Sequence, residues 1–328
     1  MSDPLVLLGE VRTCLLPTER ALAGRETSAL LALLPGQQVQ IRERPLPRAV
    51  SPGIAVGVDC VLATVRNAKA RSVGTVATHA VLVGGRVAQS SSAVRVVRAA
   101  DSNRKPWDHY LASVGTVELI PRIGDDTAAA VDLAEGFLEA SSATTLDLAS
   151  ISDRLLTRVT MDAQRGGERA PVRTSPTRLR WSARVAPTLD GEARGRTVVG
   201  FRIENESVRS VRIVVPTVQD LAAVQRFCED LAVHDWLLTT LGSALADVQG
   251  IGRDRDPVAM LSPLLEQLVH LWMPGAHTPP RMRELWSRLE ADPGFTKQWQ
   301  AQVGQLRDRL TVATLEALRS AKISDAYW

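Results

Sequence analysis

In the first 123 residues, hydrophobic positions alternate with polar ones in short runs that end at turn residues. A period of two predicts strands over 5–16, 38–44, 54–64, 71–83, 86–98 and 116–121. Gly84-Gly85 predicts a tight hairpin, because both glycines accept the positive φ of a primed turn. One helix is expected between residues 18 and 34. Strands this closely spaced favour an antiparallel sandwich or partial barrel.

The pattern changes after residue 123. Residues 124–165 have the spacing of two helices, the first beginning at Asp125-Asp126-Thr127, and 166–175 are a linker rich in Gly, Arg and Pro. Residues 177–215 alternate again and predict a three-stranded meander with a tight turn at 204–207.

From residue 217 onward the hydrophobic period is helical. Thr217 with Asp220 has the form of a capping box, and a broad apolar stripe follows it to Leu245. Five of the seven tryptophans lie in this part of the chain. The sequence therefore predicts an α+β fold divided into a β-rich domain at 1–123, a helical connector at 124–165, a linker with the meander at 166–216, and a helical bundle at 217–328.

Composition narrows the cellular setting. The 328 residues include three cysteines, Cys14, Cys60 and Cys228, without a CxxC spacing, which indicates a reducing compartment. The first residues lack the basic and long apolar regions of a signal peptide, and no apolar run reaches the roughly 20 residues of a spanning helix. We expect a cytoplasmic protein that is not integral to a membrane.

The meander carries a concentration of arginine. Side chains alternate along a strand, so one face of the predicted sheet is expected to hold Arg178, Arg180, Arg184, Arg202 and Arg212. Five guanidinium groups could bind phosphates, nucleic acid or an acidic partner. They could equally dock inside the protein, since residues 124–147 contain six acidic and no basic residues.

Catalytic motifs were sought among the histidines, cysteines and carboxylates. His234-Asp235 resembles the adjacent pair of metal-dependent phosphohydrolases, but Cys228 points about 120° away from His234 on a helix, and Asp230 suits an ordinary helical ion pair. A metal-dependent hydrolase at His234 and Asp235 is therefore a third hypothesis. His79 and His109 lack a second ligand at useful spacing, and His270 and His277 flank a helix end where histidines bond free carbonyls. Phosphate-binding loops are absent from the sequence.

The sequence thus predicts no catalytic residue, no metal ligand and no cofactor, with polar groups scattered rather than convergent. The chain ends in two large aromatic residues, Tyr327 and Trp328. Such side chains are expected to pack, either on their own bundle or on another subunit.

Four strings together resemble a known family. They are Gly9 to Pro17 (GEVRTCLLP), Cys228 to Leu241 (CEDLAVHDWLLTTL), His270 to Gly275 (HLWMPG), and Pro293-Gly294-Phe295 with Trp299. Over nearly its full length the chain resembles an uncharacterised actinobacterial family encoded in a recurring cluster with a variant P-loop protein. The resemblance implies a partner rather than an activity.

The leading hypothesis is a non-enzymatic interaction or scaffold subunit of a cytoplasmic multiprotein system, with a P-loop-type partner. The alternative is a nucleic-acid or phosphoanion-binding module that uses the meander arginines.

Overall fold

The computed structural model describes residues 3–65, 70–120, 125–139, 145–165, 172, 174–185, 198–250 and 257–325. Its ten strands belong to one sheet. They are β1 (Val6–Leu15), β2 (Gln40–Arg42), β3 (Arg48–Val50), β4 (Ile54–Leu62), β5 (Ala70–Val83), β6 (Val87–Arg98), β7 (Thr116–Leu119), β8 (Thr177–Val185), β9 (Val198–Ile203) and β10 (Val208–Val215).

The sheet has the order β2-β3-β5-β7-β6-β1-β8-β10-β9, and β4 pairs with residues 70–78 of β5. Most pairs are antiparallel, and the β5–β6 hairpin turns at Gly84 and Gly85, whose φ values are 58° and 65°. The α+β class and this hairpin are confirmed. The arrangement differs from a sandwich because the described strands form a single sheet whose two faces are covered by helices.

The predicted meander has a different strand order. β9 and β10 form the expected antiparallel hairpin, but β10 lies between β8 and β9 and pairs with β8 in parallel. Twelve residues, 186–197, separate β8 from β9 in the sequence, which is enough chain for β9 to be placed one position further out. Alternation of side chains fixes the face of each strand but not the order of neighbours, so the pattern could not exclude this order.

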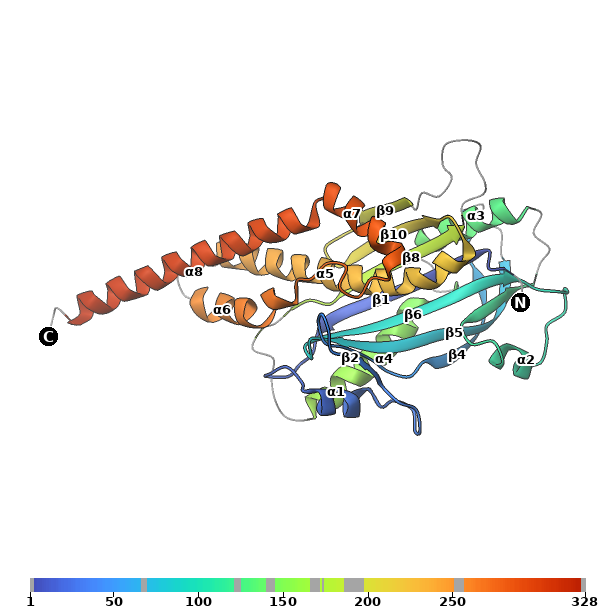
Figure 1. Cartoon of the computed structure of the whole chain (residues 1–328), viewed down its shortest axis with the longest axis horizontal. Helices are drawn as coiled ribbons and strands as arrows, with labels where there is room; N and C mark the ends of the chain where they lie inside the picture. Colours follow the sequence, from blue (N-terminus) through green and yellow to red (C-terminus); the bar gives the residue numbers. More distant parts are fainter. Residues whose placement is uncertain are drawn as a thin grey trace.

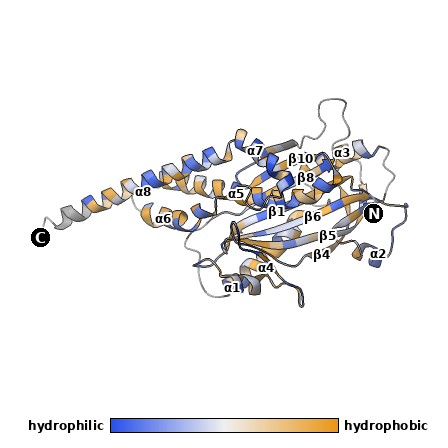
Figure 2. Cartoon of the chain, in the orientation of Figure 1, coloured by the Kyte–Doolittle hydropathy of each residue, from blue (hydrophilic) through white to orange (hydrophobic). Residues whose placement is uncertain are grey.

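Helices cover both faces of the sheet (Figure 1). The described helices are α1 (Gly24–Leu31), α2 (Trp107–Leu111), α3 (Asp126–Glu139), α4 (Leu148–Gln164), α5 (Val218–Gly250), α6 (Pro257–Gln267), η1 (Val269–Leu271), η2 (Pro280–Met282), α7 (Arg283–Ala291) and α8 (Phe295–Asp325). α3 and α4 pack on one face, and α5 packs on the other. The strands between these layers are largely hydrophobic (Figure 2).

The side chains of β1 alternate between the two faces of the sheet and contribute to a different apolar core on each face. Leu7 and Val11 join the apolar core that contains α5 to α8, whereas Val6 and Leu8 join the core beneath α3. Because successive side chains of a strand point to opposite faces, one strand anchors both layers. The bundle and the sheet therefore share one continuous core on the α5 side.

Gly9 on β1 lies directly opposite Trp181 on β8, whose side chain is fully buried. A Cβ atom at position 9 would lie 2.2 Å from the indole ring. We expect Gly9→Ala to lower the free energy of unfolding by about 1–3 kcal/mol, because the tryptophan must move within a packed core. Urea denaturation measures the loss. Gly24→Ala, which adds a methyl group where no atom lies within 4 Å, is the control and is expected to be neutral.

Candidate functional site

The structure brings the predicted arginine face together on the side of the sheet that α3 covers. Arg178 donates a hydrogen bond of 2.7 Å to Glu10 of β1, whose side chain is almost fully buried. Burial raises the pKa of Glu10, and the nearby arginines only partly offset that rise. This arginine therefore pairs with one oxygen of a buried carboxyl group within the protein.

Two further arginines of this face contact α3. Arg180 donates to the carbonyl oxygens of Phe137 and Leu138, and its guanidinium lies 5.0 Å from the centre of the Phe137 ring. Arg212 forms an ion pair with Glu135. The first, acidic helix predicted within residues 124–165, observed as α3, thus covers part of the arginine face.

Arg184 and Arg202 lie on the same face of the sheet. Arg202 is exposed and Arg184 is half-buried, and within the described part of the chain neither has a carboxylate at ion-pair distance. A site for a large anion would therefore rest on these two side chains rather than on five.

A second polar cluster lies between the sheet and α5, where the sequence predicted scattered groups. Glu229 of α5 is 3% exposed. One of its carboxylate oxygens lies 2.5 Å from a guanidinium nitrogen of Arg48 on β3, and the other lies 2.8 Å from Nε2 of His79 on β5. Gln89 of β6 donates to the Glu229 carbonyl oxygen at 2.9 Å. Three strands are thereby tied to one helix residue.

The charges in this cluster are paired. Burial alone would raise the pKa of Glu229, but the charge and hydrogen bond of His79 and the charge of Arg48 outweigh it and lower this pKa to about 2. Glu229 is therefore an anion at every physiological pH. The spacing of residues around His79 could not indicate this partner, because Glu229 lies 150 positions away in the sequence.

The neighbouring residue on α5 extends the cluster into the bundle. Asp230 accepts a hydrogen bond of 2.7 Å from the Thr278 hydroxyl, which in turn accepts one from the Trp286 indole. His234 places Nδ1 at 2.7 Å from the Asp230 carbonyl oxygen, and its Nε2 accepts the Met273 backbone N–H at 3.2 Å. These two contacts require a neutral imidazole with its proton on Nδ1.

His234 and Asp235 therefore do not act as a pair. Both nitrogens of His234 are occupied by backbone groups, and Asp235 accepts Arg209 Nε at 3.0 Å on another side of α5. Within the described ranges, no group of three or more His, Cys, Asp and Glu residues is placed to hold a metal ion. The two ligands of the hypothetical metal-dependent hydrolase, His234 and Asp235, make these other contacts instead.

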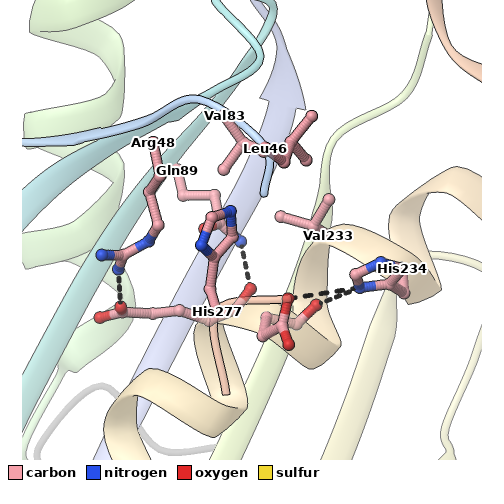
Figure 3. A pocket seen from close by; sticks show the side chains of 9 residues that line it. Leu46, Arg48, Val83, Gln89, Val233, His234 and His277 are labelled. Carbon is pink, nitrogen blue, oxygen red and sulfur yellow. Dashed lines mark hydrogen bonds and ion pairs between the residues drawn. The ribbon is translucent and has the colours of Figure 1, made fainter. Parts of the chain in front are cut away.

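His277 is the unusual member of the cluster. It is 5% exposed, and among the described residues neither ring nitrogen has a hydrogen-bond partner. Figure 3 shows its ring between Arg48 and Val233. Burial, together with the charge of Arg48, lowers the pKa of His277 to about 4, although Asp230 opposes the shift. Neither nitrogen bonds a free carbonyl at a helix end, as its place in the sequence led us to expect, and the ring lies against the sheet residues Arg48 and Val83 instead.

A cavity of about 500 Å³ lies between α5 and α6. Its lining includes the hydroxyl groups of Thr239, Thr240 and Ser243, and of the described lining residues Asp247 alone is charged. A phosphate-bearing cofactor would place its negative charge beside this carboxylate without a compensating cation, so the residues present do not fit such a group.

Helix α8 forms a projection. Its first half packs in the core through Phe295, Trp299, Val303 and Leu306, and Trp299 stacks on Trp272 with ring centroids 4.4 Å apart. Its second half extends past α5 and α6 (Figure 1). Three apolar side chains on that half are more than half exposed: Val312 at 55%, Leu315 at 51% and Leu318 at 57%.

Tyr327 and Trp328, the predicted docking tail, lie outside the described residues. Among the described helices, none combines the length and the apolarity that crossing a membrane requires. Comparison with protein-family models, with curated proteins and with solved structures finds no match to this chain.

Proposed function

We propose that the protein is a non-enzymatic interaction subunit of a cytoplasmic multiprotein system, and that the projecting half of α8 is its attachment element. The observation that carries the proposal is the exposure of Val312, Leu315 and Leu318 on a helix that extends away from the body. Residues 310–318 contain a single charged residue, Glu316. Exposed apolar positions gathered on one element are typical of a protein–protein contact.

The arrangement of the buried polar groups supports the same conclusion. Arg48 and His79 both pair with Glu229 beneath the bundle, and these ion pairs connect the sheet to α5. Such a cluster fixes the position of the bundle on the sheet. A rigid body that holds one projecting helix in a fixed direction suits a scaffold.

The resemblance supports a P-loop protein as the partner, because the family it names is encoded beside one. The anion-binding alternative has less support, since Arg178, Arg180 and Arg212 already contact Glu10 and α3. We therefore propose the interaction subunit alone.

Co-expression with the P-loop protein that the resemblance implies as a gene neighbour tests the proposal. The two proteins are expected to elute together from a tag on the P-loop protein. The full-length variant Ala317→Glu/Leu318→Glu is expected to lose that association without losing stability, because both positions are exposed. Glu206→Arg, in the exposed turn between β9 and β10, is the control. Failure of the wild-type chain to bind would make the proposal wrong, and binding by the α8 variant would exclude α8 as the attachment.

A further inference from the structure

The projecting half of α8 carries a second stripe on the side opposite its buried one. We call Asp308, Val312, Leu315 and Arg319 the outer stripe; their spacing is four, three and four residues. At about 100° per residue these four side chains fall within an arc of about 60°, and Leu315 lies about 180° from the buried Leu306. All four are exposed. The stripe therefore faces away from α5 and α6.

The outer stripe is complementary in charge and apolarity to a second copy of itself that runs in the opposite direction. Its two ends carry opposite charges, Asp308 toward the body and Arg319 toward the end of the helix, and its two middle positions are apolar. The midpoint between Val312 and Leu315 along the helix coincides with the midpoint between Asp308 and Arg319. In an antiparallel pair, Val312 of each copy therefore lies against Leu315 of the other copy. Likewise, Asp308 of each copy lies against Arg319 of the other. Within the described residues, neither charged side chain has an ion-pair partner in its own chain.

We propose that two copies of this chain pair through the outer stripes of their α8 helices, in antiparallel orientation. A parallel pair would set Asp308 against Asp308 and Arg319 against Arg319, which like-charge repulsion disfavours. An antiparallel pair also places the second body beyond the free end of α8, away from the first (Figure 1). The proposal rests on the proposed function and divides the projecting helix between two contacts. The side that carries Val312 and Leu315 pairs with a second copy, and Leu318, about 60° further round the helix, is left to the partner.

The length of the stripe sets the strength of the pair. Twelve residues of helix span about 18 Å, and each copy contributes two apolar side chains at the centre of the contact. Such a small interface is typical of a weak, reversible association. The dimer is therefore expected to have a micromolar Kd and to form in a concentration-dependent way.

Sedimentation of the purified full-length chain from about 1 to about 200 µM tests the pairing, since this range brackets a micromolar Kd. The wild-type chain is expected to shift from monomer to dimer. Leu315→Glu is expected to weaken the dimer at least about tenfold, because it places two carboxylates in the apolar centre. Glu206→Arg, far from α8, is the control. A chain that stays monomeric throughout, or a Leu315→Glu variant that dimerises as the wild type does, overturns the proposal.

Charge reversal tests the orientation. Asp308→Arg and Arg319→Asp each turn two attractive contacts into two repulsive ones, so each is expected to weaken an antiparallel dimer by about tenfold. The double variant Asp308→Arg/Arg319→Asp restores both attractive contacts and is expected to recover wild-type dimerisation. In a parallel pair neither single variant would change the number of like-charge contacts, so single variants without effect overturn the antiparallel register.

The two proposals fail separately. A chain that is always monomeric but still binds the P-loop protein would overturn the self-pairing and leave the proposed function standing. A dimer that does not bind the P-loop protein would overturn the proposed partner and leave the self-pairing standing.

Discussion

Replacement of Arg48 by methionine is expected to lower the free energy of unfolding by about 3–5 kcal/mol. The substitution leaves the Glu229 carboxylate at 3% exposure with His79 and the Ser91 hydroxyl as its remaining side-chain partners. Because a buried charge that loses a partner recovers little solvation, the cost is much larger than the net contribution of the original pair. Urea denaturation at neutral pH measures the change.

Two variants separate this explanation from simple loss of packing. Arg71→Met removes a surface arginine that lies 3.4 Å from Asp59 and whose side chain is 61% exposed, so it is expected to cost less than about 1 kcal/mol. Arg48→Met/Glu229→Gln removes the charge together with its partner, and it is expected to cost less than the sum of the two single variants. Strict additivity would contradict a coupled pair.

Stability is expected to fall as the pH drops from 6.5 to 4, because of His277. Its pKa is about 4 in the folded protein and 6.5 when unperturbed. The unfolded chain therefore binds a proton in this interval that the folded protein excludes, and the stabilisation present above pH 6.5 is lost progressively toward pH 4. A shift of this size corresponds to about 3 kcal/mol in total.

His277→Leu identifies the group responsible. The variant is expected to lose most of this pH dependence, and at pH 7.5 to be at least as stable as the wild type, because the ring nitrogens it removes lack partners. His270→Gln, at an exposed histidine in the same region, is expected to keep the wild-type profile. Denaturation curves at pH 7.5 and 4.5 give the comparison. An unchanged slope in His277→Leu would show that other groups cause the pH dependence.

The sequence predicted the elements that hydrophobic periodicity defines. β1, β4, β5 and β6 lie close to their predicted ranges, and the Gly84-Gly85 turn is where two adjacent glycines indicated it. β3 has three residues and α2 has five, which is too short for a period to be recognised. The order of β8, β9 and β10 was missed because alternation is silent about which strands are neighbours.

The polar cluster was missed for a different reason. Arg48 and Glu229 are 181 positions apart in the sequence, and their proximity depends on how α5 crosses the sheet. One local signal was present: Glu229 and Asp230 interrupt the apolar stripe of α5 between Phe227 and Leu231. Two adjacent carboxylates on a buried helix face require partners, so this pair could have been singled out. The acidic composition of residues 124–147 did indicate what covers the arginine face, as Glu135 on Arg212 shows.

We propose that this protein works as one component of an assembly. The most direct test is the composition and mass of the particle that carries the chain when it is isolated from its own cells at native abundance. We predict a particle heavier than one chain that contains a P-loop nucleotide-binding protein at a fixed ratio to it. Recovery of the chain as a single-copy species without that protein would contradict this role in an assembly.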